Sequence, residues 1–146
     1  MTVILSGSEV AIQLTARFPG SVSEAVPQYI VINVDHFLQV IDYLKNSPET
    51  GLEYLADITA TDYLDYFEVN YRLGAFEKNL SLTVKVRCTD RLKPELPSVI
   101  SLWKGADLME LEIYDLMGIY FQGHPNMKRL FLWEGFKGYP LRKDYL

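Results

Sequence analysis

The chain has 146 residues and a formal net charge of −5, with 49% hydrophobic and 23% charged residues. This composition is typical of one globular domain with a buried core. The acidic balance argues against nucleic acid as a general partner, and no apolar run approaches the roughly 20 residues that span a bilayer. No Lys or Arg precedes Arg17, so the N-terminus lacks the positive region of a signal peptide, which predicts a cytoplasmic protein.

The first third of the chain alternates between helical and strand patterns. Residues 8–20, SEVAIQLTARFPG, predict a short amphipathic helix that ends at the Pro-Gly pair. The β-branched apolar run at 28–34 predicts a buried strand. Residues 36–46 predict a second helix, because their apolar residues recur at helical spacing.

The middle of the chain predicts three strands in succession. Residues 52–64 show a threonine-rich alternation, and residues 66–76 and 80–89 alternate strictly between apolar and polar side chains. The short segment 77–79 lies between the last two patterns and predicts a hairpin turn.

The last third predicts one more helix and then an extended tail. Residues 98–118 read as one helical region that is broken near Gly105 and ends at Gly118. All helical and strand periodicity stops there, so residues 1–118 are expected to build an α+β core, and residues 119–146 a docking tail of the same domain. The fold class expected is a two-layer α+β sandwich, with helices on one face of a mainly antiparallel mixed sheet.

Two carboxylates in the last predicted helix raise a physical question. At about 100° per residue, Leu108, Glu112 and Asp115 fall on one helix face with apolar neighbours. Buried unpaired charges cost several kcal/mol, so we expect donors from the tail, such as Lys128 or Arg129. Two alternatives stay open: solvated acids at the edge of an amphipathic helix, and a general acid–base couple.

Few residues could hold a metal or act as a nucleophile. Cys88 is the one cysteine, and it lies in an alternating strand pattern that predicts a packed residue. With His36 and His124 as the only histidines, the chain cannot build a four-cysteine iron–sulfur site or a usual structural zinc site. We therefore expect no catalytic, cofactor-binding or metal site on this chain, and we expect His124 to be a hydrogen-bonding loop residue.

Residues 110–145, ELEIYDLMGIYFQGHPNMKRLFLWEGFKGYPLRKDY, carry a family resemblance. The segment resembles the 30 kDa subunit family of NADH-quinone oxidoreductase (respiratory complex I), which is shared with related subunits of membrane-bound energy-converting hydrogenases. Upstream segments are similar as well, so the resemblance covers roughly residues 52–146. The positions that match the family pattern are Glu110, Glu112, Asp115, Gly118, Ile119, Gly123, His124, Pro125, Lys128, Arg129, Gly138, Pro140, Leu141, Arg142, Lys143 and Asp144.

The sequence departs from the family pattern at several points. Leu111 stands where the family usually has Arg, Tyr139 stands where His is usual, and LFLWEGF replaces the commoner Leu-Pro-Glu-Asp-Trp motif. Many members also continue beyond the position of Leu146. These departures favour a compact or divergent version of the family, such as a hydrogenase-related one.

The resemblance implies a structural subunit of an enzyme complex. Such a subunit belongs to the hydrophilic arm of NADH:quinone oxidoreductase, carries no cofactor, and supports electron transfer from NADH to quinone coupled to ion translocation. Its partners would be the large subunit of the quinone site, or a hydrogenase-type large subunit, and iron–sulfur subunits, with FMN, iron–sulfur clusters and quinone bound there. The location implied is peripheral, on the cytoplasmic side of the cell membrane, and membrane association comes only through the complex.

Two alternatives to that function remain. The chain could be the equivalent subunit of an energy-converting hydrogenase, or a free-standing α+β interaction domain. In the interpretation favoured by the resemblance, the matched positions from Glu110 to Asp144 form a docking or structural signature. Arg142 and Lys143 would pair with acidic groups on the partner, since Arg can bind a carboxylate bidentately.

Overall fold

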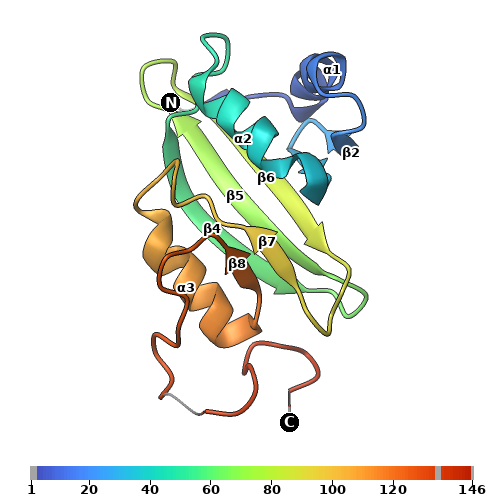
Figure 1. Cartoon of the computed structure of the whole chain (residues 1–146). Helices are drawn as coiled ribbons and strands as arrows, with labels where there is room; N and C mark the ends of the chain where they lie inside the picture. Colours follow the sequence, from blue (N-terminus) through green and yellow to red (C-terminus); the bar gives the residue numbers. More distant parts are fainter. Residues whose placement is uncertain (1–2, 134–135, 146) are drawn as a thin grey trace.

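The computed structural model describes residues 3–133 and 136–145, and this part of the chain folds around one mixed sheet (Figure 1). The strands of the sheet are β1 (Val3–Ile4), β2 (Val22–Val26), β3 (Tyr29–Ile32), β4 (Tyr54–Asp62), β5 (Phe67–Ala75) and β6 (Leu80–Cys88). The helices are α1 (Gly7–Arg17), α2 (Phe37–Asn46), which follows a 3-10 turn η1 (Val34–His36), and α3 (Ala106–Met117). Two short strands, β7 (Glu95–Pro97) and β8 (Tyr120–Gln122), pair with each other.

The sheet is mixed but mainly antiparallel, as expected. Its strand order is β2-β3-β6-β5-β4, and β1 pairs with the first residues of β6, ahead of the start of β3. Both β1 and β3 run parallel to β6, whereas β2–β3, β4–β5 and β5–β6 are antiparallel. The long crossover from β3 to β4 through α2 allows β3 to run parallel to β6.

One face of the sheet is apolar and covered by the helices. Alternate residues of β5 and β6 point to that face and are buried: Phe67, Val69, Tyr71, Leu73, Leu82, Val84 and Val86. They form one core cluster with residues of all three helices, such as Leu14, Phe37 and Met117. Figure 1 shows the helices on this side of the sheet. The opposite face carries polar and charged side chains, among them Arg72 and Lys85, so the two-layer α+β architecture is confirmed.

The structure differs from the sequence prediction between residues 98 and 105. This segment forms turns instead of the first part of a helix, because the helical bond from the Trp103 N–H to the Val99 carbonyl is not continued. The next backbone bonds, from Ala106 to Trp103 and from Asp107 to Lys104, span only three residues. The N–H of Ser98 donates to the carbonyl of Gln122, the last residue of β8, at 2.8 Å. The helix therefore begins only at Ala106.

The core also continues past Gly118, where helical periodicity ends. Ile119 and Phe121 are fully buried in the main cluster, and Leu96 of β7 pairs in register with Phe121 of β8. The expectation that the core stops near Gly118 was therefore wrong.

Among the described residues, no helix combines the length and apolar character that crossing a bilayer requires.

Candidate functional site

The tail folds back along the C-terminal half of α3, in the lower part of Figure 1. The backbone N–H of Leu141 donates to the carbonyl of Leu116 at 2.9 Å, and Nε of Arg142 donates to the carbonyl of Met117 at 2.6 Å. Carbonyls in the last turn of a helix have no intrahelical partner. The tail supplies those partners, so helix end and tail form one unit, which we call the α3–tail junction (residues 106–133 and 136–145).

Asp115 is the buried centre of this junction. Its Oδ2 accepts three successive backbone N–H groups, from Leu130 at 3.1 Å, Phe131 at 2.6 Å and Leu132 at 3.0 Å. Nη1 of Arg129 lies 3.2 Å from its Oδ1. Burial works to raise the pKa of Asp115, but the backbone donors and Arg129 outweigh it and hold the pKa below its usual value. The expected pairing of Asp115 with tail donors is therefore present.

Glu112 does not share this environment. The three residues Leu108, Glu112 and Asp115 share one side of the helix, as predicted, but only Asp115 is buried. The expectation that tail donors pair with both acids was therefore wrong for Glu112. The reason is that α3 is buried on two opposite sides. Ala106, Glu110, Ile113 and Met117 face the core, whereas Leu111 and Asp115 lie on the other side, and Glu112 falls between the two buried strips.

Glu110 is the second buried carboxylate of α3. The Ser98 hydroxyl donates to its Oε1 at 2.5 Å, and the Val99 N–H donates to its Oε2 at 2.9 Å. Burial raises the pKa of Glu110, and these two donors offset part of that effect. Glu110 thus fixes the turn before α3 to the helix, with its two oxygens occupied by donors of the same chain.

His124 closes the loop between β8 and the rest of the tail. The imidazole is buried, with Nε2 at 2.8 Å from Oδ1 of Asp107, near the start of α3. Its Nδ1 accepts the backbone N–H of Asn126 at 3.0 Å, so the ring hydrogen lies on Nε2 and is donated to Asp107. Both ring nitrogens are engaged in holding the loop, as expected for a hydrogen-bonding loop residue.

A further buried carboxylate, Asp62 at the end of β4, anchors the last residues of the tail. Nη1 and Nη2 of Arg91 lie 2.6 and 3.0 Å from its two oxygens, and the backbone N–H of Lys143 donates to Oδ2 at 2.9 Å. Arg91 also reaches Asp144 at 3.2 Å. The hydrogen bond from Arg91 holds the pKa of Asp62 well below its usual range. Sequence reasoning missed this cluster, because Asp62 lies in a predicted strand and Arg91 follows another strand 29 residues later, and no local pattern shows their contact.

The remaining matched positions have simpler places. Gly118, Gly123 and Gly138 have positive φ angles of 79°, 90° and 90°, which favour glycine. Ile119 is buried, Pro140 is half-buried, and Pro125, Lys128 and the side chain of Lys143 are exposed. Tyr139, which stands where the family has His, lies under the Arg142 guanidinium at 4.7 Å.

A metal site would require the fold to bring potential metal ligands together. Across residues 3–133 and 136–145, no group of three or more His, Cys, Asp or Glu side chains is placed to hold a metal ion. Cys88 is a buried free thiol, and burial raises its pKa to about 12. A thiol with such a pKa is not a nucleophile at neutral pH, which agrees with its expected packing role.

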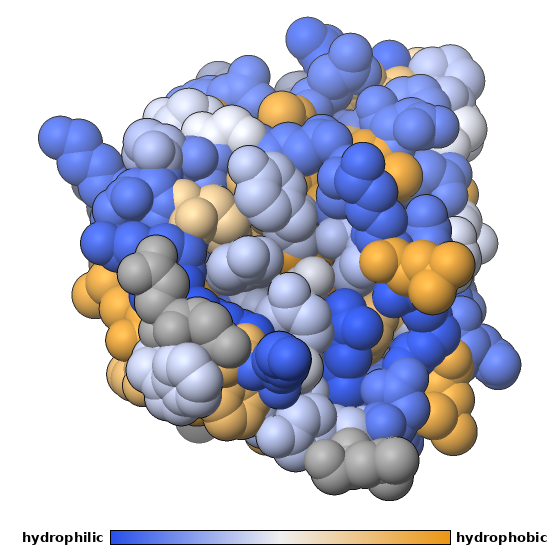
Figure 2. Space-filling model, turned by 60° about the horizontal axis from the view of Figure 1, so that its bottom comes forward, coloured by the Kyte–Doolittle hydropathy of each residue, from blue (hydrophilic) through white to orange (hydrophobic). Residues whose placement is uncertain are grey.

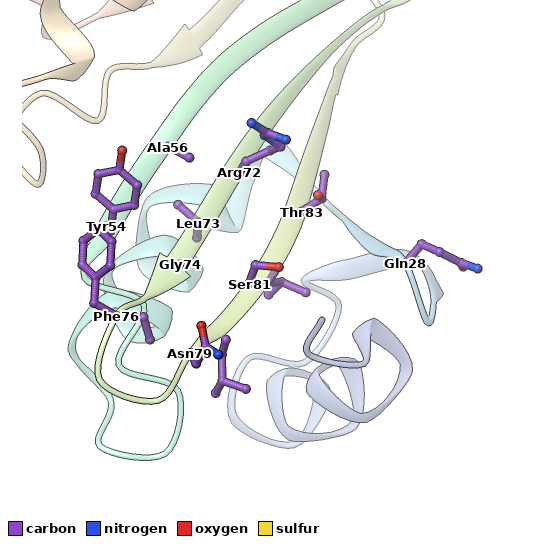
Figure 3. A pocket seen from close by; sticks show the side chains of 13 residues that line it. Gln28, Tyr54, Ala56, Arg72, Leu73, Gly74, Phe76, Asn79, Ser81 and Thr83 are labelled. Carbon is purple, nitrogen blue, oxygen red and sulfur yellow. The ribbon is translucent and has the colours of Figure 1, made fainter. Parts of the chain in front are cut away.

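A separate hollow of about 380 Å³ lies on the open face of the sheet (Figure 3). Tyr54 and Phe76 form one wall, with ring centroids 4.7 Å apart, and Gly74 leaves part of the floor without a side chain. Arg72 is the one charged residue among its lining residues, and it pairs with Asp57 at 2.8 Å. The hollow presents no carboxylate or imidazole for acid–base chemistry, and no residue of the α3–tail junction lines it.

The family profile described as "Respiratory-chain NADH dehydrogenase, 30 Kd subunit" matches residues 30–146. The C-type subunit of NADH-quinone oxidoreductase from Moorella thermoacetica is 40% identical over 118 residues, which cover 80% of this chain and 78% of that protein. The C/D-type subunit of NADH-quinone oxidoreductase from Phocaeicola vulgatus is 46% identical over 105 residues, which cover 71% of this chain but only 20% of the longer protein.

A solved structure is similar over nearly the whole fold. One chain of the membrane-bound sulfane sulfur reductase (MBS), an archaeal respiratory membrane complex, matches with a TM-score of 0.76 and 25% identity. The match covers 95% of this chain and 85% of that one. The profile match, the sequence relatives and the shared fold agree: the chain belongs to the 30 kDa subunit family of respiratory-chain NADH dehydrogenase.

Proposed function

We propose that the chain is a structural subunit, without a cofactor of its own, in the peripheral arm of an NADH:quinone oxidoreductase. The observation that carries the proposal is the α3–tail junction, which belongs to the segment that matches the family. Its two buried carboxylates accept hydrogen bonds from the same chain: Asp115 from residues 129–132, and Glu110 from Ser98 and Val99. Carboxylates whose oxygens accept hydrogen bonds from the same chain stabilise the local conformation, and they are poorly suited to exchange protons with a substrate.

The tail is the surface that we assign to a partner. Phe131 and Trp133 are 67% and 69% exposed, and Leu141 is also exposed. Figure 2 shows this end of the molecule, where apolar groups stand in separate patches among hydrophilic side chains. Large exposed aromatic groups beside a polar surround are typical of a protein interface. Since Asp115 and Asp62 fix the tail backbone before docking, less conformational entropy is lost on binding.

The partner that we propose is the large subunit that helps to form the quinone site, with iron–sulfur subunits nearby. FMN, the iron–sulfur clusters and quinone would then be bound by those subunits. The chain would be peripheral, on the cytoplasmic side of the membrane, and would reach it only through the complex. The likeness to a chain of a sulfane sulfur reductase complex favours one second candidate, the equivalent subunit of another membrane-bound redox complex such as an energy-converting hydrogenase.

Affinity purification from mild-detergent membrane extracts of the source organism tests the proposal. We expect a tagged chain to bring down iron–sulfur subunits and a large subunit, and the preparation to oxidise NADH with a quinone acceptor. A complex with the same architecture but hydrogenase or sulfur-reducing activity would select the second candidate. Recovery of the chain as a monomer, with NADH:quinone activity unchanged in a deletion strain, would contradict both.

A further inference from the structure

A cavity of about 370 Å³ lies where α3 ends, between the link that follows β6, strand β8 and the tail. Its lining is rich in hydrogen-bond donors and in tyrosine rings: Leu92, Lys93, Pro94, Glu95, Tyr114, Gly118, Tyr120, Tyr139 and Arg142. Three segments that are distant in the sequence therefore meet around one opening. None of the internal carboxylate sites described above uses this cavity.

Arg142 presents a fixed guanidinium to the cavity. The group lies over the rings of Phe67 at 5.0 Å and Tyr139 at 4.7 Å, and its Nε donates to the carbonyl of Met117. Within the described residues, its two terminal nitrogens have no acceptor. A guanidinium that is held by its Nε and its faces offers the remaining edge as a planar fork, which matches the two oxygens of a carboxylate.

Gly118 makes room for this arrangement. A Cβ atom at Gly118 would lie 2.6 Å from Nη2 of Arg142 and 2.7 Å from the Tyr139 ring. Glycine at this position thus allows the guanidinium and the ring to approach the end of α3.

Lys93 adds a second cation that is only weakly engaged. Its side chain is 80% exposed, and its Nζ is 3.8 Å from Oε1 of Glu95, near the limit of an ion pair. The other oxygen of Glu95 accepts a hydrogen bond from Gln122 at 2.7 Å. The lining therefore carries two cations and one carboxylate, so it favours an anion even though the whole chain has a net charge of −5.

The rim of the cavity indicates that the anion belongs to a protein. Leu92 is 98% exposed and Tyr120 is also exposed, so apolar surface borders the cationic opening. A small free carboxylate would leave this rim in water, whereas a polypeptide would cover it while placing a side chain inside. We propose that the cavity receives the carboxylate of an Asp or Glu side chain from the adjoining subunit, with Arg142 and Lys93 as its donors.

The proposal rests on the proposed function, because the adjoining subunit is a member of the same complex. A water-soluble carbodiimide, applied to the purified intact complex, joins a lysine amine to a carboxylate in direct contact. Peptide mass spectrometry should find Lys93 joined to an Asp or Glu of another subunit. The Lys93→Arg variant keeps the charge but cannot form the amide, so this link should vanish while the complex remains assembled.

Two charge reversals supply an independent readout. Lys93→Glu places a carboxylate at the opening and should lower recovery of the chain in the complex by at least about tenfold, through like-charge repulsion. The matched control is Lys104→Glu, an exposed lysine just before the other end of α3, which should leave recovery unchanged. Both variants should retain the thermal melting temperature of the isolated wild-type chain, since neither lysine is buried.

The outcomes separate the two proposals. An assembled complex in which Lys93 is joined only to Glu95 of its own chain, with Lys93→Glu recovered like Lys104→Glu, would overturn the cavity assignment and leave the proposed function standing. A wild-type chain that enters no complex at all would overturn both.

Discussion

Asp115 on α3 and Arg129 in the tail lie 3.2 Å apart, and this contact fixes residues 129–132 against the helix. The carboxylate is fully buried and the arginine side chain is largely buried, so neither group can turn to water if its partner is lost. The pair thus connects the core of the domain to the surface that we assign to a partner.

Asp115→Ala should destabilise the isolated domain by about 3–5 kcal/mol, because three backbone N–H groups lose their acceptor and the largely buried Arg129 loses its carboxylate. Within the described residues, Arg129 keeps only carbonyl acceptors, such as those of Phe136 and Gly138. Glu112→Ala is the matched control on the same helix. Its side chain is exposed, so the loss should stay below about 1 kcal/mol. Urea unfolding of both variants measures the difference. Equal small losses would mean that the Asp115 contacts contribute little to stability.

The pH dependence of stability follows from the buried carboxylates. The pKa values of Asp115 and Asp62 are lowered by folding from an ordinary value of 3.8. Their stabilising contribution is therefore fully present above that value and is lost as the pH falls through the folded pKa. Glu110 has the opposite sign: its folded pKa lies above 4.5, so its contribution is fully present below 4.5 and is lost as the pH rises through the folded pKa.

Urea unfolding between about pH 3 and about pH 7 checks these signs. The wild type should lose stability steeply towards the acid end, and Asp115→Asn should show a shallower loss there. The change in unfolding free energy caused by Glu110→Gln should be more favourable at neutral pH than at acid pH, since the amide carries no charge to bury. Parallel curves for Asp115→Asn and the wild type would contradict the assignment of a lowered pKa to Asp115.

Alanine substitutions at two glycines with nearly equal φ angles measure the effect of the close packing at the end of α3. Gly20 and Gly118 have φ angles of 80° and 79°, but a Cβ at Gly20 would meet nothing within 4 Å. Gly20→Ala should therefore cost only the backbone strain, about 1 kcal/mol. Gly118→Ala should cost at least about 1 kcal/mol more, because its methyl group meets Arg142 and Tyr139. Thermal denaturation compares the two, and equal costs would argue against tight packing there.

The long strands and helices could be read from the sequence because their patterns repeat. Every second residue is buried from Phe67 to Ala75 in β5 and from Leu82 to Cys88 in β6, which gives a period of two that the sequence reveals. β7 and β8 are only three residues long, and their stability comes from pairing Leu96 with Phe121 across the intervening helix. A local pattern cannot show such a contact, so these strands were missed.

The burial of the carboxylates of α3 could not be predicted from the local sequence either. Glu110 and Glu112 are both acids within one helical pattern, yet one is buried and the other exposed. Only the placement of the tail decides which side of the helix is covered. Similarly, Arg142 was expected to face a partner, but one nitrogen of its side chain binds the carbonyl of Met117, and only its remaining edge is open.

The most direct test of the docking tail compares exposed aromatic residues on two surfaces of the same chain. Phe131→Ser with Trp133→Ser alters the tail, and Phe76→Ser alters the open face of the sheet, where Phe76 is equally exposed at 71%. In affinity purification of the complex, the tail double variant should recover at least about tenfold less of the large subunit than the wild type does. The Phe76 variant should recover it like the wild type. Full recovery with the double variant, or loss with Phe76→Ser alone, would contradict the assignment of the tail as the docking surface.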